Sequence, residues 1–281
     1  MSTTVRELQL ALLEMAVAID EICRKYKIQY SLSSGTVLGA VRHGGFIPWD
    51  DDLDIMLVRG EYERFLQIPD EEFKRYGFTI QRAFTEEWPM FFSKVRKDGT
   101  TFIEKYPNKL KGSHQGIYID IFPVDNLYDS VLMAHIQWNA FHILAAKCLE
   151  KRGYYTNSLS KKIAMLIARI SPEKILVYFV EARRQKQSKN VHIFMGASVE
   201  RDVSIYPRSM FEEYTEIIFE GRKFSVVKDY ENYLQISYGN YMKLPPEEER
   251  QAAIHARFVD LNKSYEEYAI IKRPRKIGDR K

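Results

Sequence analysis

The sequence has few of the features that mark secreted or membrane-spanning proteins. Its two cysteines, Cys23 and Cys148, lie far apart, which fits a reduced setting without a disulfide framework. No uncharged apolar run reaches the roughly 18 residues of a membrane span. The first residues contain Arg6, Glu7 and Glu14, which a signal peptide would lack. We therefore expect a cytoplasmic protein, with the inner face of the cell membrane as an alternative location.

The charge balance also excludes some partners. The net charge of the 281 residues is only +4, which is too small to indicate nucleic-acid binding. Apolar residues make up 45% and charged residues 28% of the chain, which are ordinary globular values. The length is sufficient for one large domain or two small domains with a real core.

An acidic stretch near the N-terminus is the strongest indication of chemistry. Four carboxylates fall within five positions, Asp50, Asp51, Asp52 and Asp54, and an apolar run follows them. A strand beginning at Asp52 would project Asp52 and Asp54 from one face. Two such carboxylates repel each other, and Mg²⁺ or Mn²⁺ would relieve that repulsion. The alternative is a solvated acidic turn.

Small residues precede this stretch. Residues 28–32 predict a strand, and Ser33-Ser34-Gly35-Thr36 predicts a tight turn into a short helix over residues 37–42. Backbone N–H groups and hydroxyls of Ser34, Gly35 and Thr36 are suited to approach a phosphate. Most Ser-Gly-Thr triplets are plain turns. The prediction of a phosphate site therefore depends on the acidic stretch that follows this triplet closely in the sequence.

A third carboxylate lies in a second apolar strand. Asp120 is flanked by Ile119 and Ile121, and a buried lone carboxylate is costly unless it is paired or binds a metal. We therefore expect Asp120 to be the third ligand of the Asp52 and Asp54 site. The alternative is a core aspartate in a salt bridge. Asp125 is predicted to shape the turn after Pro123.

The middle of the chain is predicted to be helical and basic. Between residues 141 and 190 there are 11 basic and three acidic residues, so this segment carries +8 and the rest of the chain −4. Its basic residues are Lys147, Lys151, Arg152, Lys161, Lys162, Arg169, Lys174, Arg183, Arg184, Lys186 and Lys189. Apolar residues alternate with them. Such helices suit an anionic membrane or acceptor, or pack on the core with a solvated basic face.

Other segments show ordinary periodicity. An amphipathic helix is expected over residues 5–26, and strands over 78–82, 91–96 and 101–104. Glu220-Gly221-Arg222 predicts a hairpin turn, and residues 230–238 predict a helix ended by Gly239. Lys243 and Arg250 are candidate phosphate ligands, and His255 is either an acid–base group or a surface histidine. A basic tail, residues 272–281, is expected to be frayed.

Several blocks resemble the LicD family. They are Ser33 to Asp54, Gly116 to Pro123, Phe219-Glu220-Gly221, Tyr238-Gly239-Asn240-Tyr241, Pro245-Pro246 and His255. The resemblance implies a nucleotidyltransferase-type, polymerase-β-like core. It also implies transfer of a phospho-alcohol, usually phosphocholine, from a CDP-activated donor to a sugar hydroxyl. Fukutin-related proteins, which are relatives of this family, transfer ribitol phosphate instead.

The resemblance also implies site roles. Asp52 and Asp54 match the paired metal ligands, Asp120 the third carboxylate, and Gly35 and Thr36 the phosphate-facing turn. Arg42 and His43 lie in the same signature block and are expected to bind substrate. Asp51 departs from the wider superfamily, which has a hydrophobic residue before the first acid. An aromatic cage is expected for choline, with Trp49, Trp88 and Tyr118 as candidates.

We therefore predict an α+β fold with a mixed sheet and a largely helical insertion. The expected parts are a catalytic core over residues 1–126, a basic helical segment over 127–200, and residues 201–281 completing the core. The expected activity is Mg²⁺-dependent transfer of phosphocholine from CDP-choline to a teichoic acid or lipopolysaccharide-type precursor, with a lipid-linked acceptor included. Alternatives are a CTP-dependent nucleotidyltransferase, a ribitol phosphate transferase and a catalytically silent scaffold.

Overall fold

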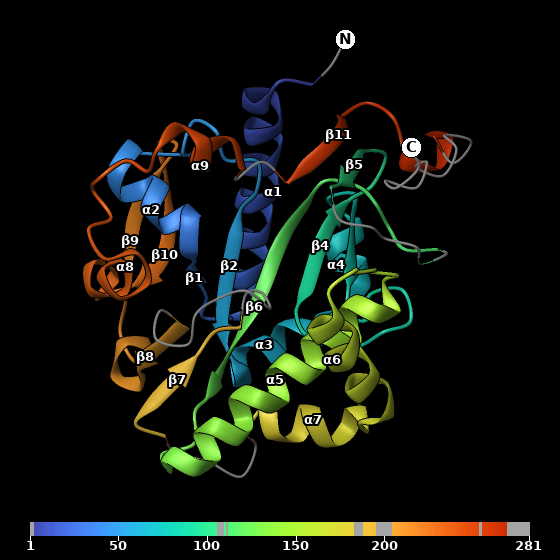
Figure 1. Ribbon diagram of the computed structural model, residues 1–281. Helices are drawn as coiled ribbons and strands as arrows, with labels where there is room; N and C mark the ends of the chain where they lie inside the picture. Colours follow the sequence, from blue (N-terminus) through green and yellow to red (C-terminus); the bar gives the residue numbers. More distant parts are fainter. Residues whose placement is uncertain are drawn as a thin grey trace.

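A mixed β-sheet runs through the molecule (Figure 1). The computed structural model describes residues 3–105, 110, 112–182, 188–194, 204–252 and 255–268. Five neighbouring strands lie in the order β1 (Ser31–Leu32), β2 (Asp54–Val58), β6 (Tyr118–Asn126), β4 (Ser93–Lys97) and β3 (Phe78–Gln81). β7 (Asn190–His192) pairs with β6, and β8 (Ile205–Pro207) pairs with β7, which gives seven strands.

The strand register places charged residues side by side. β2 and β6 are parallel, with Asp54 opposite Asp120, whereas β4 is antiparallel to β6, with Lys94 opposite Asp120. Side chains opposite each other on neighbouring strands share a face of the sheet. Asp54, Asp120 and Lys94 therefore form one row across the sheet. The predicted α+β class with a mixed sheet is confirmed.

The long first helix covers the sheet beside β6 and closes its core. α1 (Val5–Tyr26) is the helix predicted over residues 5–26. It begins with a capping box, in which the Thr4 hydroxyl accepts from Glu7 N–H and the Glu7 carboxylate accepts from Thr4 N–H. It ends at Lys27, which adopts a left-handed conformation. Buried side chains such as Met15 and Ile19 pack with Ile119 and Ile121 in one core.

The described residues of the predicted helical section form three helices. α5 (Val131–Lys151) packs on α6 (Leu159–Ile170) and on α7 (Glu173–Val180). None of the described helices combines the length and the apolar character that crossing a membrane requires. Arg183, Arg184, Lys186 and the tail over residues 272–281 lie outside the described residues. The division of the chain into three parts stays a prediction.

The C-terminal part returns to the sheet. The predicted hairpin is confirmed as β9 (Tyr214–Phe219) and β10 (Arg222–Val227), and the predicted helix as α8 (Tyr230–Tyr238). α9 (Glu247–Ala252) precedes β11 (Ala256–Asp260), which pairs with β5 (Thr101–Glu104). The remaining short elements are α3 (Arg59–Leu66), α4 (Asp70–Lys74), and the 3₁₀ turns η2 (Arg208–Phe211) and η3 (Tyr265–Tyr268).

Three predicted boundaries are wrong. α2 (Ser34–His43) begins at Ser34, so the predicted turn is already helix, and Gly44 closes it with a positive φ. β2 begins at Asp54, so Asp52 lies in the segment before the strand rather than within it. Asp125 is a strand residue of β6 and does not shape a turn, because β7 pairs with it and extends the ladder.

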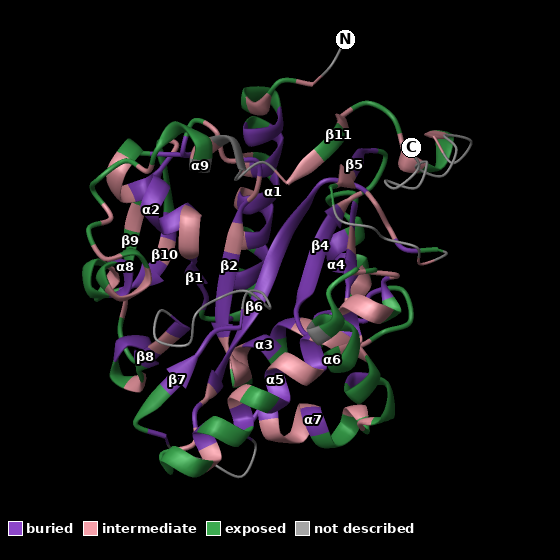
Figure 2. Cartoon of the chain, viewed as in Figure 1, coloured by how far each residue is buried: buried purple, intermediate pink, exposed green. Residues whose placement is uncertain are grey.

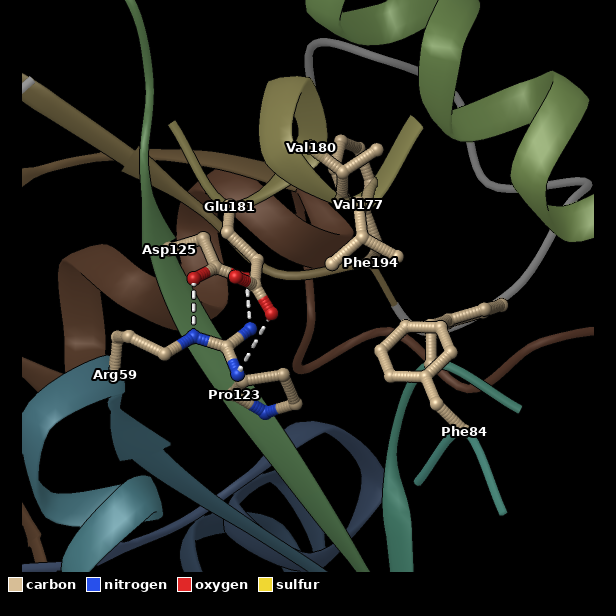
Figure 3. A pocket seen from close by; sticks show the side chains of 9 residues that line it. Arg59, Phe84, Pro123, Asp125, Val177, Val180, Glu181 and Phe194 are labelled. Atoms are coloured by element: carbon tan, nitrogen blue, oxygen red, sulfur yellow. Dashed lines mark hydrogen bonds and ion pairs between the residues drawn. The ribbon is translucent and has the colours of Figure 1, made fainter. Parts of the chain in front are cut away.

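Asp125 instead holds two helices against the sheet. Arg59 at the start of α3 donates to both Asp125 oxygens, at 2.6 and 2.5 Å. Glu181, just after α7, lies 3.7 Å from the same guanidinium (Figure 3). All three side chains are largely removed from solvent. This ion-pair cluster therefore ties α3, β6 and the end of α7 together.

A buried histidine nearby makes stability depend on pH. His192 on β7 is buried, and its Nε2 lies 2.8 Å from Gln137 Nε2 and 3.2 Å from the Val180 carbonyl oxygen. Removal from water lowers the pKa of His192 to about 4. The unfolded chain therefore takes up a proton first as the pH falls below about 6.5. We expect the free energy of unfolding to fall by up to roughly 3 kcal/mol between pH 7 and pH 4.

Urea unfolding at pH 7, 5.5 and 4 checks this expectation. His192→Gln should flatten the pH dependence, whereas His135→Gln, at an exposed position of α5, should leave it as in the wild type. An equal slope in the wild type and His192→Gln would assign the acid sensitivity to other groups.

Candidate active site

The candidate site is built on the row of charged residues that crosses the sheet. Asp54 opens β2, and its backbone N–H donates to the Thr36 hydroxyl at 2.9 Å, which fixes the strand against α2. Asp120 lies opposite it on β6. Asp52 lies two residues before β2, and its charge acts on both of the other carboxylates. The structure therefore places Asp54 and Asp120 side by side on the sheet, with Asp52 in the segment that leads into β2.

A buried lysine completes the row. Lys94 Nζ lies 2.8 Å from Asp120 Oδ1 and 3.4 Å from Glu104 Oε1 on β5. Its ammonium also lies 3.2 Å from the centre of the Tyr118 ring. This ammonium engages the buried Asp120 Oδ1. Asp120 is therefore a salt-bridged carboxylate, as the alternative interpretation held.

The carboxylates disfavour each other's charge. Removal from water raises the pKa of Asp54 well above its ordinary value, and the charges of Asp52, Asp120 and Asp50 add to the shift. Burial likewise raises the pKa of Asp120, although Lys94 opposes it. The pKa of Asp50 is raised well above its ordinary value by removal from water and then by Asp52. A site with this much unrelieved negative charge suits a cation.

Oxygen donors of this kind fit a hard divalent ion. Asp52, Asp54 and Asp120 supply carboxylate oxygens, which are the ligands that Mg²⁺ and Mn²⁺ prefer. Ligand atoms of a second group, Asp51, Asp52 and His255, lie within 4.8 Å of one another. Both oxygens of Asp51 already accept backbone hydrogen bonds, however. The mutual repulsion of Asp52, Asp54 and Asp120 keeps the three-carboxylate set as a candidate.

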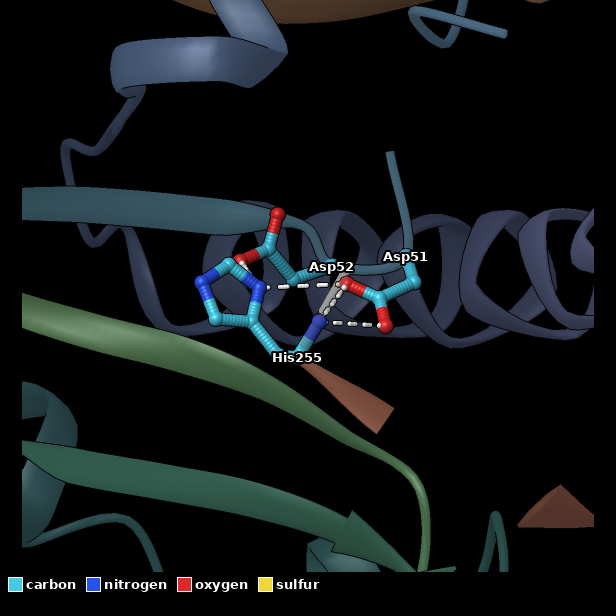
Figure 4. A group of neighbouring side chains, drawn as sticks. All are labelled: Asp51, Asp52 and His255. Atoms are coloured by element: carbon cyan, nitrogen blue, oxygen red, sulfur yellow. Dashed lines mark hydrogen bonds and ion pairs between the residues drawn. The ribbon is translucent and has the colours of Figure 1, made fainter. Parts of the chain in front are cut away.

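Asp51 fastens the C-terminal strand beside the acids (Figure 4). Its buried carboxylate accepts from His255 N–H, at 3.0 and 2.8 Å, and from Ala256 N–H at 2.7 Å. Burial alone would raise the pKa of Asp51, but hydrogen bonds from the His255 side chain and from these backbone groups lower it. Asp51 therefore positions the C-terminal strand. From the sequence alone it was undecided whether Asp51 also contacts a metal.

His255 is held between two aspartates. Its Nδ1 lies 3.1 Å from Asp51 Oδ1 and 3.2 Å from Asp52 Oδ2. The hydrogen bond to Asp51 raises the pKa of His255, and the charges of Asp52, Asp51 and Asp120 support the shift. The candidate acid–base histidine thus lies at the acids rather than on a remote surface.

Removing Asp51 should detach the C-terminal strand. Asp51→Ala leaves two N–H groups without their acceptor, so we expect a loss of roughly 3 kcal/mol in the free energy of unfolding. Hydrogen exchange should increase over residues 256–260. Arg257→Ala, at an exposed position of β11, should change neither quantity. Unchanged exchange in Asp51→Ala would mean that the β5 pairing alone holds β11.

The start of α2 faces a carboxylate. A side-chain carbon added at Gly35 would come within 2.9 Å of Asp50 Oδ2, so that carboxylate lies directly against the helix start. Ser34 has a positive φ of 47°, and its N–H donates to the Tyr233 hydroxyl at 3.0 Å. Thr36 is engaged with Asp54. Ser34, Gly35 and Thr36 therefore lie at the acidic site, and Asp50 faces the position expected for a phosphate.

The other predicted substrate residues form a second group around Trp49. The Arg250 guanidinium lies 5.0 Å above the Trp49 ring, and exposed His43 meets that ring edge-on at 6.2 Å between centroids. Arg42 donates to the Tyr241 carbonyl at 2.9 Å and lies 3.5 Å from the Lys243 carbonyl. Arg42 thus holds the loop after α8, while the Lys243 side chain is on the surface.

The two remaining aromatic candidates contact cations of the chain itself. Trp88 is fully buried, with Lys94 at 5.0 Å and Arg152 at 4.8 Å from its ring. Tyr118 contacts Lys94 and Arg96. Trp49 is the candidate whose ring is only partly buried.

Sequence reasoning missed Lys94, Glu104 and Asp50 as members of the site. Lys94 stands between Ser93 and Val95 in a short strand, where a lone lysine reads as a solvated residue. Glu104 belongs to a network in which Arg152 donates to it at 2.5 Å. One signal was available in the sequence. Residues two apart in a strand share a face, so Lys94 and Arg96 lie on the same face of β4.

Comparison with known proteins agrees with this geometry. The LicD/FKTN/FKRP nucleotidyltransferase domain matches residues 27–144, which include Asp52, Asp54, Lys94 and Asp120. The lipopolysaccharide cholinephosphotransferase LicD of Haemophilus influenzae is 29% identical over 256 residues, or 88% of this chain and 95% of that protein. Both of these matches support the LicD family.

Two rickettsial proteins match over shorter stretches. An uncharacterized protein of Rickettsia prowazekii is 35% identical over 117 residues, which cover 38% of this chain and 44% of that protein. An uncharacterized protein of Rickettsia typhi is 43% identical over 169 residues, which cover 51% of this chain and 54% of that protein.

Proposed function

We propose that the protein transfers phosphocholine from CDP-choline to a sugar hydroxyl of a lipopolysaccharide-type glycan precursor and releases CMP. Two observations support this. The cholinephosphotransferase of Haemophilus influenzae is similar over most of both chains. Asp54 and Asp120 also lie opposite each other on parallel strands, with Asp52 beside them. This juxtaposition of carboxylates is the observation that carries the proposal.

Mg²⁺ or Mn²⁺ held by Asp52, Asp54 and Asp120 fits the proposed reaction. Bound there, such an ion would offset negative charge on the diphosphate of the donor and on the departing CMP. The mutual repulsion of the carboxylates supports this assignment.

Other steps of the proposed reaction are assigned to side chains of the site. The sugar oxygen attacks the phosphorus that carries choline, a new P–O bond forms, and the bond from that phosphorus to the bridging oxygen of CMP breaks. Asp120 takes the proton of the sugar hydroxyl, and Lys94 holds that carboxylate in place. Arg250, Lys243 and the start of α2 serve the phosphates, and Trp49 faces the choline ammonium.

Product analysis tests the proposal. The purified protein is incubated with Mg²⁺, CDP-choline and a deacylated lipopolysaccharide acceptor, and CMP and labelled acceptor are measured. CMP release that depends on acceptor supports the proposal. Pyrophosphate release from CTP and phosphocholine would favour a nucleotidyltransferase, and turnover of CDP-ribitol alone would favour a ribitol phosphate transferase. Absence of all three products would favour the scaffold interpretation.

A further inference from the structure

Helix α6 presents its apolar side to solvent. Leu159, Ile163, Leu166, Ile167 and Ile170 are between 45 and 77% exposed. At about 100° per residue, these five side chains fall within roughly one quarter to one third of the helix circumference. Figure 2 shows exposed and partly exposed residues along α6, whereas the neighbouring strands β4 and β6 are buried. An amphipathic helix of a globular domain normally turns this stripe toward the core, so its orientation here needs another explanation.

The opposite side of α6 fixes that orientation. Ala168 is fully buried, which places it against the rest of the protein. Lys147 of α5 donates to the carbonyls of Ala168, Arg169 and Ser171, at 2.8, 3.2 and 3.1 Å. These bonds cap the C-terminal end of α6 on α5. The helix therefore cannot roll its apolar side inward without losing them.

A basic side chain borders the apolar stripe. Lys162 lies about 40° around the helix from Leu166, whereas Lys161 falls on the side of Ala168. Both of these lysines and Lys174 of α7 are exposed. Tyr155, which is 70% exposed, lies beneath the Lys162 ammonium at 5.8 Å. Two acidic residues of the same region are engaged, because Glu150 pairs with Arg169 and Glu173 pairs with Lys151.

This combination suits an anionic lipid surface. Aliphatic residues would enter the boundary between headgroups and acyl chains, and the lysines would remain at the phosphate level. An aqueous protein partner would not require the surrounding positive charge, whereas a bilayer rich in anionic lipid supplies the complementary charge. We propose that α6 docks the protein on an anionic membrane by inserting this apolar stripe.

A series of ion pairs links the end of α5, the helix on which α6 packs, to the candidate active site. Arg152, which follows α5 directly, donates to Glu104, Glu104 pairs with Lys94, and Lys94 pairs with Asp120. The docking itself does not rest on the proposed function, because binding to lipid needs no transfer reaction.

Vesicle sedimentation with the full chain tests the proposal. We expect binding to vesicles of phosphatidylethanolamine and phosphatidylglycerol, and weaker binding to pure phosphatidylcholine. The triple variant Ile163→Glu, Leu166→Glu, Ile170→Glu should lose at least about tenfold in affinity for the anionic vesicles. Lys161→Gln with Lys162→Gln and Lys174→Gln should remove most of the salt-sensitive part of binding. The control Val131→Glu, Leu132→Glu changes equally exposed residues of α5 and should bind like the wild type.

Several results would overturn the proposal. They are a wild type that does not sediment with anionic vesicles, a triple variant that binds as tightly as the wild type, and a control variant that loses as much affinity. A wild type that is a dimer, with a monomeric triple variant and unchanged vesicle binding, would assign the stripe to a second copy of the chain. Because the substituted side chains are exposed, equal melting temperatures should show that all variants are folded.

Discussion

Asp54→Asn should lower acceptor-dependent CMP release at least about 10³-fold while making the metal-free protein more resistant to heat. The loss follows from removal of one charged ligand from a site whose electrostatic stabilisation is worth several kcal/mol in enzymes of this chemistry. The gain in stability follows from the repulsion that Asp54 shares with Asp52, Asp120 and Asp50. An amide of the same shape relieves that repulsion. A purely structural carboxylate would show the opposite change in stability.

The gain should also depend on pH. The pKa of Asp54 is raised in the folded protein, so the folded state binds more protons than the unfolded state, and stability is lost as the pH rises through the raised value. The stabilising effect of Asp54→Asn is therefore expected to be larger at pH 8 than at pH 5. Thermal unfolding in EDTA at both pH values measures it.

Magnesium and a second aspartate provide the controls. Mg²⁺ should raise the melting temperature of the wild type, because it binds the folded state, and should have little effect on Asp54→Asn. Asp125→Asn, which weakens the pair with Arg59, should instead lower the melting temperature and leave the Mg²⁺ effect intact. Normal CMP release by Asp54→Asn would remove the acidic row from the proposed chemistry.

Lys94→Met should destabilise the fold by about 3–5 kcal/mol, the usual cost of removing one partner from a buried ion pair. Lys94 faces Asp120 at 2.8 Å and Glu104 at 3.4 Å, and its side chain is only 3% exposed. Methionine fills the space but removes the ion-pair partner of Asp120, whereas Glu104 keeps Arg152. Urea unfolding measures the loss, and transfer activity should fall because Asp120 is no longer held in place.

Lys97→Met is the matched control on the same strand. Lys97 pairs with Glu14 at 3.2 Å, but that carboxylate is 74% exposed, and surface pairs contribute about 0–1 kcal/mol. Its replacement should therefore be nearly neutral. If Lys94→Met were equally neutral, Asp120 would have to be protonated or hydrated in the folded protein.

Local sequence was sufficient to identify much of this architecture. The capping box and apolar spacing of residues 5–26 specify α1, and Glu220-Gly221 specifies the hairpin because both residues adopt positive φ. Asp120 was identified because a carboxylate between two isoleucines demands a partner or a metal. In each case the residues that determine the structure lie within a few positions of one another in the sequence.

The elements that were missed depend on partners distant in sequence. Nothing near Lys94 indicates that β4 will lie beside β6 in a register that opposes Lys94 to Asp120. The role of Asp51 depends on His255 and Ala256, which lie more than 200 residues away. The register of strand pairs, rather than the identity of the strands, was the missing information.

The bonds from His255 and Ala256 to Asp51 also affect biosynthesis. Asp51 emerges from the ribosome early, whereas its hydrogen-bond partners are synthesised 204 and 205 residues later. A nascent chain with most of its sheet formed would still lack the strand that orders the segment beside Asp52. Ordering of this segment would therefore wait until residues 255 and 256 are synthesised, and termination before residue 255 would yield a chain in which Asp51 lacks these hydrogen-bond partners.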